Sequence, residues 1–149
     1  MGDGFYDGLT AAPDHPGWQR WSVGPPESFN QYVLGPMLVR AEDERFARVR
    51  LTPRPHHTNV NDVLHGGLLL SFIDTAMFSA ASVLSGRSQA RGVTVDVQVQ
   101  FLSPGRMQAD LDAQIEITRE TGRLLFMRGL LEQGDDKVAS FTGLLRKLS

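Results

Sequence analysis

The chain contains no cysteine, and this absence removes several classes of chemistry at once. A sequence of 149 residues without cysteine offers no disulfide, no thiolate metal site and no cysteine nucleophile. It also lacks an excess of either charge, because 15 Lys and Arg stand against 17 Asp and Glu. No overall field would gather nucleic acid or anionic lipid, so we expect neither as a partner, and any anionic ligand must be held by local basic residues.

Signals for export or membrane insertion are weak as well. The first 18 residues have no basic segment followed by an apolar one, so no secretory signal is indicated and we expect a cytoplasmic protein. Residues 63–84 carry only His65 and Asp74 as ionisable groups and are long enough to span a membrane. A sheet wrapped around this segment explains it better, because a lone span would leave the neighbouring strand-like segments uncovered.

Hydrophobic periodicity predicts one long helix among several strands. From 66 to 84 apolar residues fall on every side, which is typical of a buried helix. Residues 93–101 alternate strictly, which predicts the valines on one face of a strand and Thr94, Asp96 and Gln98 on the other. Short connections favour antiparallel hairpins among the further predicted strands, which are 37–40, 46–51, 109–117, 124–131 and 138–146.

The order of these elements predicts the fold class and the domain organisation. We expect an α+β fold in which an antiparallel sheet of five to six strands wraps around one long central helix, because no second helix is available for parallel crossovers. Residues 35–149 would form this domain. Residues 1–34 are rich in Gly, Pro and Asp, and we interpret them as an N-terminal extension with at most a short helix near 28–34.

Asp74 is the residue most suggestive of chemistry. It lies between Ile73 and Thr75 in an otherwise apolar helix, where a carboxylate loses hydration unless it finds hydrogen-bond partners or has a raised pKa. Carboxylates of this kind are frequent in active sites. A buried structural aspartate, held by a serine or a backbone N–H, is the equally open alternative.

Gly66 and Gly67 open the same helix, where the first N–H groups have no intrahelical partner and the helix dipole attracts negative charge. Such a terminus can hold an oxyanion, although paired glycines are also common where a helix packs tightly on a sheet. Gly66 and Asp74 are eight residues apart, which is roughly 12 Å along a helix axis. One carbonyl group cannot contact both in one chain, so their joint action predicts a homodimer with its sites in the interface.

Residues 59–74 combine Asn59, the tripeptide His65-Gly66-Gly67 and Asp74 at fixed spacing. This combination resembles the signature of hotdog-fold acyl-CoA thioesterases of the phenylacetate-degradation (PaaI-like) type, in the 4-hydroxybenzoyl-CoA thioesterase superfamily, and the resemblance covers about residues 35–146. It implies a hotdog fold, hydrolysis of an acyl- or aryl-CoA to a free acid and CoA, and no cofactor. It also implies a homodimer, two of which often associate into a tetramer.

The resemblance also implies roles for individual residues. Asp74 matches the general base or nucleophile, and Gly66 matches the residue whose N–H donates to the thioester oxygen. Asn59 and Thr94 match positions that orient the water or the carboxylate from opposite subunits. His65 matches a residue that supports the helix start or polarises the carbonyl, and a purely structural cap is an equally open interpretation.

Substrate contacts can be assigned only in outline. Gly67 adjoins the expected oxyanion site and is included among the substrate-binding residues. The phosphates of CoA require basic partners, and the resemblance to CoA enzymes leads us to select Arg106, which follows a turn, with Arg119 and Arg123 at a predicted hairpin. Exposed arginines that serve only solubility are the alternative.

Two further features concern the loop before the helix. The chain has Asp62 where the family often has a glycine, three residues before the histidine. His56 and His57 are adjacent in a Pro-rich stretch, a spacing that does not match familiar zinc ligand sets, so no metal site is predicted.

Two other functions stay open at this point. A fold does not fix an activity, so the same residues suit a non-catalytic acyl-CoA-binding module, and an enoyl-CoA hydratase or dehydratase of the same fold is a further alternative. The acyl group is equally open, because aromatic and medium-chain groups both fit an apolar pocket.

Overall fold

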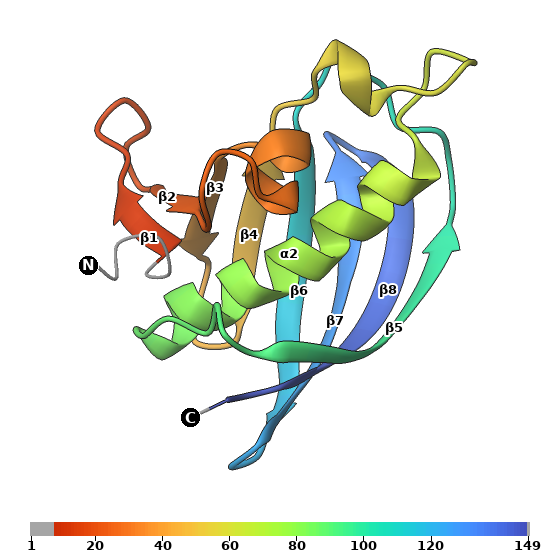
Figure 1. Ribbon diagram of the computed structural model, residues 1–149. Coiled ribbons are helices and arrows are strands. Elements are labelled where there is room, and N and C mark those ends of the chain that lie inside the picture. Colours follow the sequence, from red (N-terminus) through yellow and green to blue (C-terminus); the bar gives the residue numbers. More distant parts are fainter. Residues whose placement is uncertain (1–7, 149) are drawn as a thin grey trace.

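The computed structural model describes residues 8–148 as an antiparallel sheet curled around one long helix, α2, which spans Gly66–Ser85 (Figure 1). The strands are β1 Gly8–Ala11, β2 Gln19–Ser22, β3 Met37–Ala41, β4 Phe46–Leu51, β5 Val93–Phe101, β6 Leu111–Glu120, β7 Leu124–Gln133 and β8 Asp136–Arg146. Two short helical turns are η1, Asn30–Leu34, and η2, Pro55–His57. Residues 1–7 of the predicted extension and residue 149 of the predicted domain lie outside the described residues.

The α2 helix confirms the buried helix predicted from the apolar residues on all its sides. Phe72, Ile73 and Met77 are fully buried against the sheet. The helix ends at Gly86, whose left-handed backbone (φ 70°) suits a residue without a side chain. By length and composition α2 could cross a membrane, but 61% of its most apolar window is buried inside the fold, as in the core helix of a globular domain.

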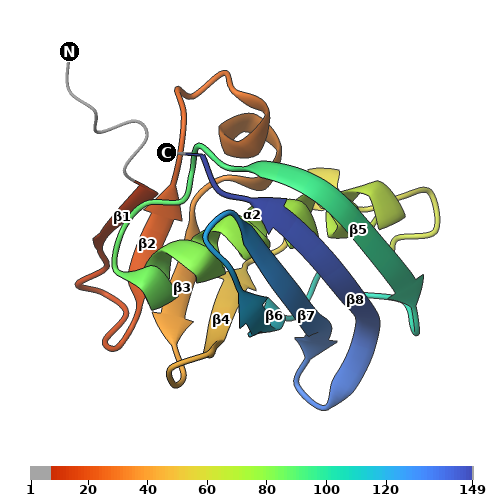
Figure 2. The ribbon, with the colours of Figure 1, turned by 90° about the horizontal axis from the view of Figure 1, so that it is seen from below.

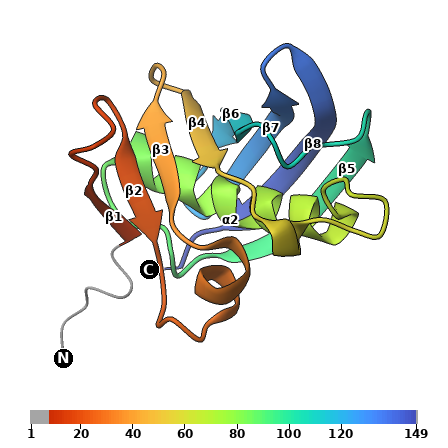
Figure 3. The same ribbon diagram turned by 90° about the horizontal axis from the view of Figure 1, so that it is seen from above.

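The sheet has eight strands, in the order β1-β2-β3-β4-β6-β7-β8-β5, and the prediction of five to six strands was wrong in this respect (Figure 3). The two additional strands, β1 and β2, lie in the predicted extension and pair beside β3. Each has only four residues, so neither shows a readable alternation. Their anchor is Trp21, a buried side chain of β2 that packs so closely on Gly8 of β1 that any side chain at Gly8 would collide with it. The short helix expected near residues 28–34 is present as η1.

Strand β5 is an edge of the sheet and pairs only with β8 (Figure 2). Its register shifts between Thr94 and Asp96, so Val95 is an extra residue that forms a bulge. Thr94 therefore faces α2 together with Val97, and the predicted face assignment was wrong at this position. The sequence alternates strictly through this strand and so gives no sign of a bulge. The extra residue turns Thr94 to the other face of the sheet, although the order of apolar and polar residues stays the same.

Candidate active site

Asp74 lies in the middle of α2 on the side that faces β5. Its Oδ1 accepts a hydrogen bond of 2.5 Å from the Thr94 hydroxyl, which reaches the helix because of the bulge in β5. Asp74 is only partly buried. The carboxylate is therefore oriented by a neighbour and still open to an incoming molecule, whereas a sealed structural aspartate would be inaccessible.

The start of α2 provides an unpaired backbone donor at Gly66. His65 is the N-cap, and its Nδ1 accepts the N–H of Gly67 at 2.8 Å. Since Nδ1 acts as acceptor, a neutral His65 carries its proton on Nε2. Among the described residues the N–H of Gly66 has no hydrogen-bond acceptor. Gly66 can thus bind an anionic oxygen, while Gly67, selected as a substrate contact, has its N–H already engaged.

The loop before the helix is shaped by Asn59. Its side-chain Oδ1 accepts the N–H groups of Asn61 at 2.8 Å and Val63 at 3.4 Å. Asp62 adopts φ 57°, the left-handed backbone for which a glycine is the usual choice and which aspartate tolerates better than most residues. The loop therefore keeps a glycine-like conformation with Asp62. In this chain Asn59 lies in the loop before α2, and its contacts are to that loop.

The two halves of the predicted site stay apart within one chain. Asp74 and Thr94 lie at one level of α2, and Gly66 lies eight residues earlier, roughly 12 Å along the axis. Beside Gly66 is Phe101, the last residue of β5. A Cβ atom at position 66 would lie 3.7 Å from Cζ of the Phe101 ring. The apolar character of Phe101 gave no signal of this contact.

The selected arginines do not form one phosphate site in a single chain. Arg106 makes a 2.7 Å ion pair with Asp136. Arg106 precedes β6, whereas Arg119 lies near the end of that strand and Arg123 in the turn that follows it. A strand of 10 residues extends roughly 33 Å, so Arg106 is far from the other two. Arg119 lines a cavity of about 240 Å³ at the C-terminal end of α2. A larger cavity of about 740 Å³ lies on the sheet face away from α2, lined by Gln98, Arg128 and Thr142 among others, and neither cavity includes Asp74.

His56 and His57 fasten the N-terminal segment to the loop before the helix. The Nε2 of His57 donates to the carbonyl of Val33 at 2.6 Å, and its Nδ1 accepts the N–H of Arg54 at 3.0 Å. His56 Nε2 lies 3.1 Å from the same carbonyl oxygen. Burial lowers the pKa of His57, and nearby Arg54 and His56 add to this effect. Both nitrogens of His57 are used in these contacts, so the residue is structural.

The η1 turn reaches the helix next to Asp74. The side-chain oxygen of Asn30 accepts a 3.2 Å hydrogen bond from the hydroxyl of Thr75. Figure 3 shows η1 on the same side of the sheet as α2. The predicted extension thus belongs to the surroundings of the candidate site, a contact that neither residue type nor spacing could reveal.

Several known proteins are similar to this chain in sequence or in fold. A family model described as the thioesterase superfamily matches residues 61–140. Human acyl-coenzyme A thioesterase 13 is 30% identical over 70 residues, which cover 47% of this chain and 49% of that protein. The PaaI protein of the E. coli phenylacetic acid degradation operon superimposes with a TM-score of 0.67 at 23% identity, over 83% of this chain and 86% of that one. A hypothetical thioesterase protein from Streptococcus pneumoniae, solved with coenzyme A, gives a TM-score of 0.64 at 17% identity, over 74% and 86% of the two chains. The predicted hotdog fold is confirmed by these structures.

Proposed function

We propose that this chain, which belongs to the thioesterase superfamily, hydrolyses acyl-CoA thioesters to a free acid and CoA at a site shared by two copies of the chain. The observation that carries the proposal is that one helix holds both an oriented, accessible carboxylate at Asp74 and a backbone N–H at Gly66 for which the described part of the chain offers no acceptor. CoA as the thiol is supported by the names of the human relative and of the streptococcal structure.

The chemistry needs only these two kinds of group. The Asp74 carboxylate, held by Thr94, takes a proton from water as the water oxygen bonds to the thioester carbonyl carbon. The carbonyl oxygen gains negative charge, which the Gly66 N–H and the positive end of the helix dipole stabilise. The C–S bond then breaks and the thiolate of CoA leaves. In an alternative route the Asp74 carboxylate itself attacks the thioester carbonyl carbon. This route also requires an ionised Asp74.

Two subunits are required by the spacing on α2. Because Gly66 and Asp74 are roughly 12 Å apart along the helix, one carbonyl can meet Asp74 of one subunit only together with Gly66 of the partner subunit. The edge strand β5 offers the contact surface, since its outer side has no strand partner and its Val93 and Val95 are exposed. Antiparallel pairing of two β5 strands about a twofold axis near Val97 would bring the Thr94 end of one to the Phe101 end of the other.

The test is Asp74→Asn in the full-length protein, assayed by release of thiol from a panel of acyl-CoAs. We expect turnover to be nearly abolished while circular dichroism and the unfolding temperature stay close to wild type, because Asp74 is not part of the packed core. A folded Asp74→Asn protein with normal turnover would rule out the proposed role. Tight binding of acyl-CoA by the wild type without any thiol release would identify a binding module instead.

A further inference from the structure

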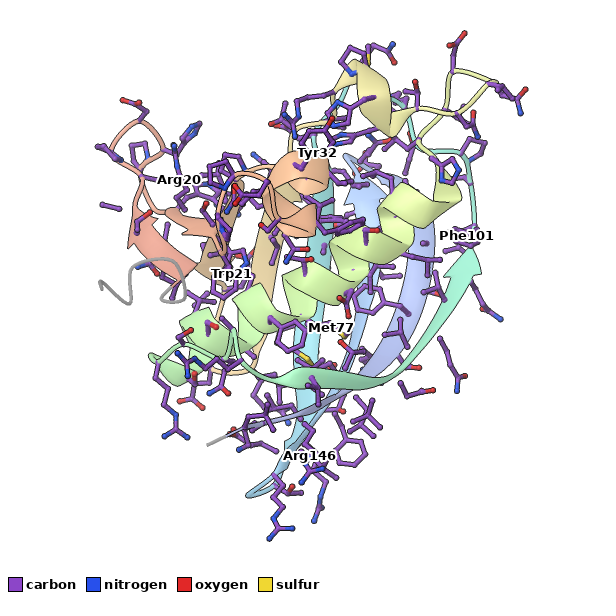
Figure 4. The ribbon with its side chains drawn as sticks, viewed as in Figure 1. Arg20, Trp21, Tyr32, Met77, Phe101 and Arg146 are labelled. Carbon is purple, nitrogen blue, oxygen red and sulfur yellow. The ribbon has the colours of Figure 1, made fainter. Side chains whose placement is uncertain are left out.

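Phe101 is a large apolar side chain in an unusual place. It is the last residue of β5 and 55% exposed, and Figure 4 shows it at the end of the strand near the start of α2. Its ring covers one side of Gly66, because a Cβ atom at that position would lie 3.7 Å from Cζ and 3.9 Å from Cε1. Exposed aromatic rings cost free energy in water and are common where a ligand or partner covers them.

The backbone position of Phe101 is set by the pairing of β5 with β8. Phe101 pairs with Ala139 of β8, a small and buried residue. The next residue, Leu102, donates its N–H to the Val138 carbonyl at 2.9 Å, so the backbone direction at this end of β5 is set. The ring therefore lies beside the Gly66 N–H, which has no acceptor among the described residues.

We propose that Phe101 is a specificity-determining residue whose ring limits the size of the acyl group at its α-carbon, an inference that rests on the proposed function. A carbonyl oxygen bound to the Gly66 N–H lies about 3 Å from that nitrogen. The carbonyl carbon and its substituents then lie close to the Phe101 ring, which is 3.7 Å from the place that a Cβ atom of residue 66 would occupy. An unbranched α-carbon fits beside the ring, and a second substituent on the α-carbon collides with it.

The ring acts on the site of the partner. Phe101 lies next to Gly66 in the folded subunit. A twofold contact that brings Gly66 to the partner's Asp74 therefore brings Phe101 there as well. The acyl group attacked with the help of Asp74 in one subunit is thus selected by Phe101 of the other.

The first measurement compares kcat/KM for isobutyryl-CoA with that for butyryl-CoA, which differ by one branch at the α-carbon. We expect Phe101→Ala to raise this ratio roughly tenfold over wild type, the usual scale for one methylene in an apolar pocket. Phe126→Ala is the matched control, because Phe126 is also a partly exposed phenylalanine but lies on the sheet face away from α2, and its ratio should not change. Phe101→Leu, which keeps the apolar surface, provides a second variant should Phe101→Ala fold poorly.

The second measurement uses a purified mixed dimer of an Asp74→Asn chain and a Phe101→Ala chain. The only intact Asp74 belongs to the Phe101→Ala chain. In the proposed shared site the phenylalanine next to it is the intact Phe101 of the Asp74→Asn chain, so we expect the wild-type ratio. The raised ratio in the mixed dimer would contradict selection by the partner's ring. An unchanged ratio in the Phe101→Ala homodimer, with an active wild type, overturns this inference alone. Absence of thiol release by the wild type overturns the proposed function and this inference with it.

Discussion

Replacing Gly66 by proline removes one N–H and little else. Gly66 is the first residue of α2, a position where proline is well tolerated because its N–H has no intrahelical acceptor. The preceding residue, His65, has φ −64° and ψ 135°, the extended conformation that a residue before proline requires. The Gly66 N–H makes no hydrogen bond within the described residues, so none is lost from the fold.

The expected effect is large on activity and small on stability. Loss of one oxyanion donor typically lowers kcat by about 10²–10³, equivalent to about 2.7–4 kcal/mol. We therefore expect Gly66→Pro to lose about two to three orders of magnitude in thiol release, measured at saturating acyl-CoA. The unfolding temperature should stay close to that of wild type, since the helix geometry is compatible with proline.

Gly66→Ala is the matched control. The added methyl group lies 3.7 Å from the Phe101 ring, an ordinary contact, and the N–H is retained. Alanine is also favoured over glycine in a helix by about 0.5–1 kcal/mol. The alanine variant should fold and turn over an unbranched acyl-CoA at a rate close to wild type. Wild-type kcat in a folded Gly66→Pro protein would refute the assignment of this N–H as the oxyanion donor.

Two other predictions concern Thr94 and His57. Thr94→Val deletes the hydroxyl that donates to Asp74, and a hydrogen bond to a charged group contributes about 1.5–3 kcal/mol. We therefore expect kcat to fall roughly ten- to a hundredfold in Thr94→Val and to be restored in Thr94→Ser, which keeps a hydroxyl. Equal kcat in both variants would show that catalysis does not use this contact. Because burial lowers the pKa of His57 below its ordinary 6.5, the unfolded chain binds a proton first as the pH falls. The contribution of His57 to the free energy of unfolding is therefore complete above pH 6.5 and declines below it. Urea unfolding between pH 8 and pH 5 should show a smaller decline for His57→Gln than for wild type, and identical declines would contradict this.

Most of the domain could be predicted from residue patterns because its elements are long. The helix over 66–84 and the strand over 93–101 were predicted within a residue of their observed ends, since each has a periodicity sustained over several turns or pairs. Strands β1 and β2 were missed because four residues are too few for a pattern, and their position depends on Trp21 packing on Gly8. The bulge at Val95 was missed because it leaves the alternation of residue types intact.

The candidate site was predictable where it depends on position along α2 and not where it depends on tertiary contacts. The distance from Gly66 to Asp74 follows from helix geometry alone. The sequence could not show that His65 occupies the N–H of Gly67, because a side-chain rotamer decides that contact. Phe101 beside Gly66 is equally invisible, since residues 35 positions apart meet only after β5 pairs along β8.

The most direct test of the shared site is a mixed dimer of an Asp74→Asn chain and a Gly66→Pro chain, purified through two different affinity tags. Each homodimer should be nearly inactive. If the site combines Asp74 of one subunit with Gly66 of the partner subunit, one of the two sites in the mixed dimer is intact, and thiol release should recover to about half of the wild-type rate per dimer. If both groups acted within one chain, each site would contain one of the two substitutions and the mixed dimer would be as inactive as the homodimers. That result would contradict a site shared between subunits.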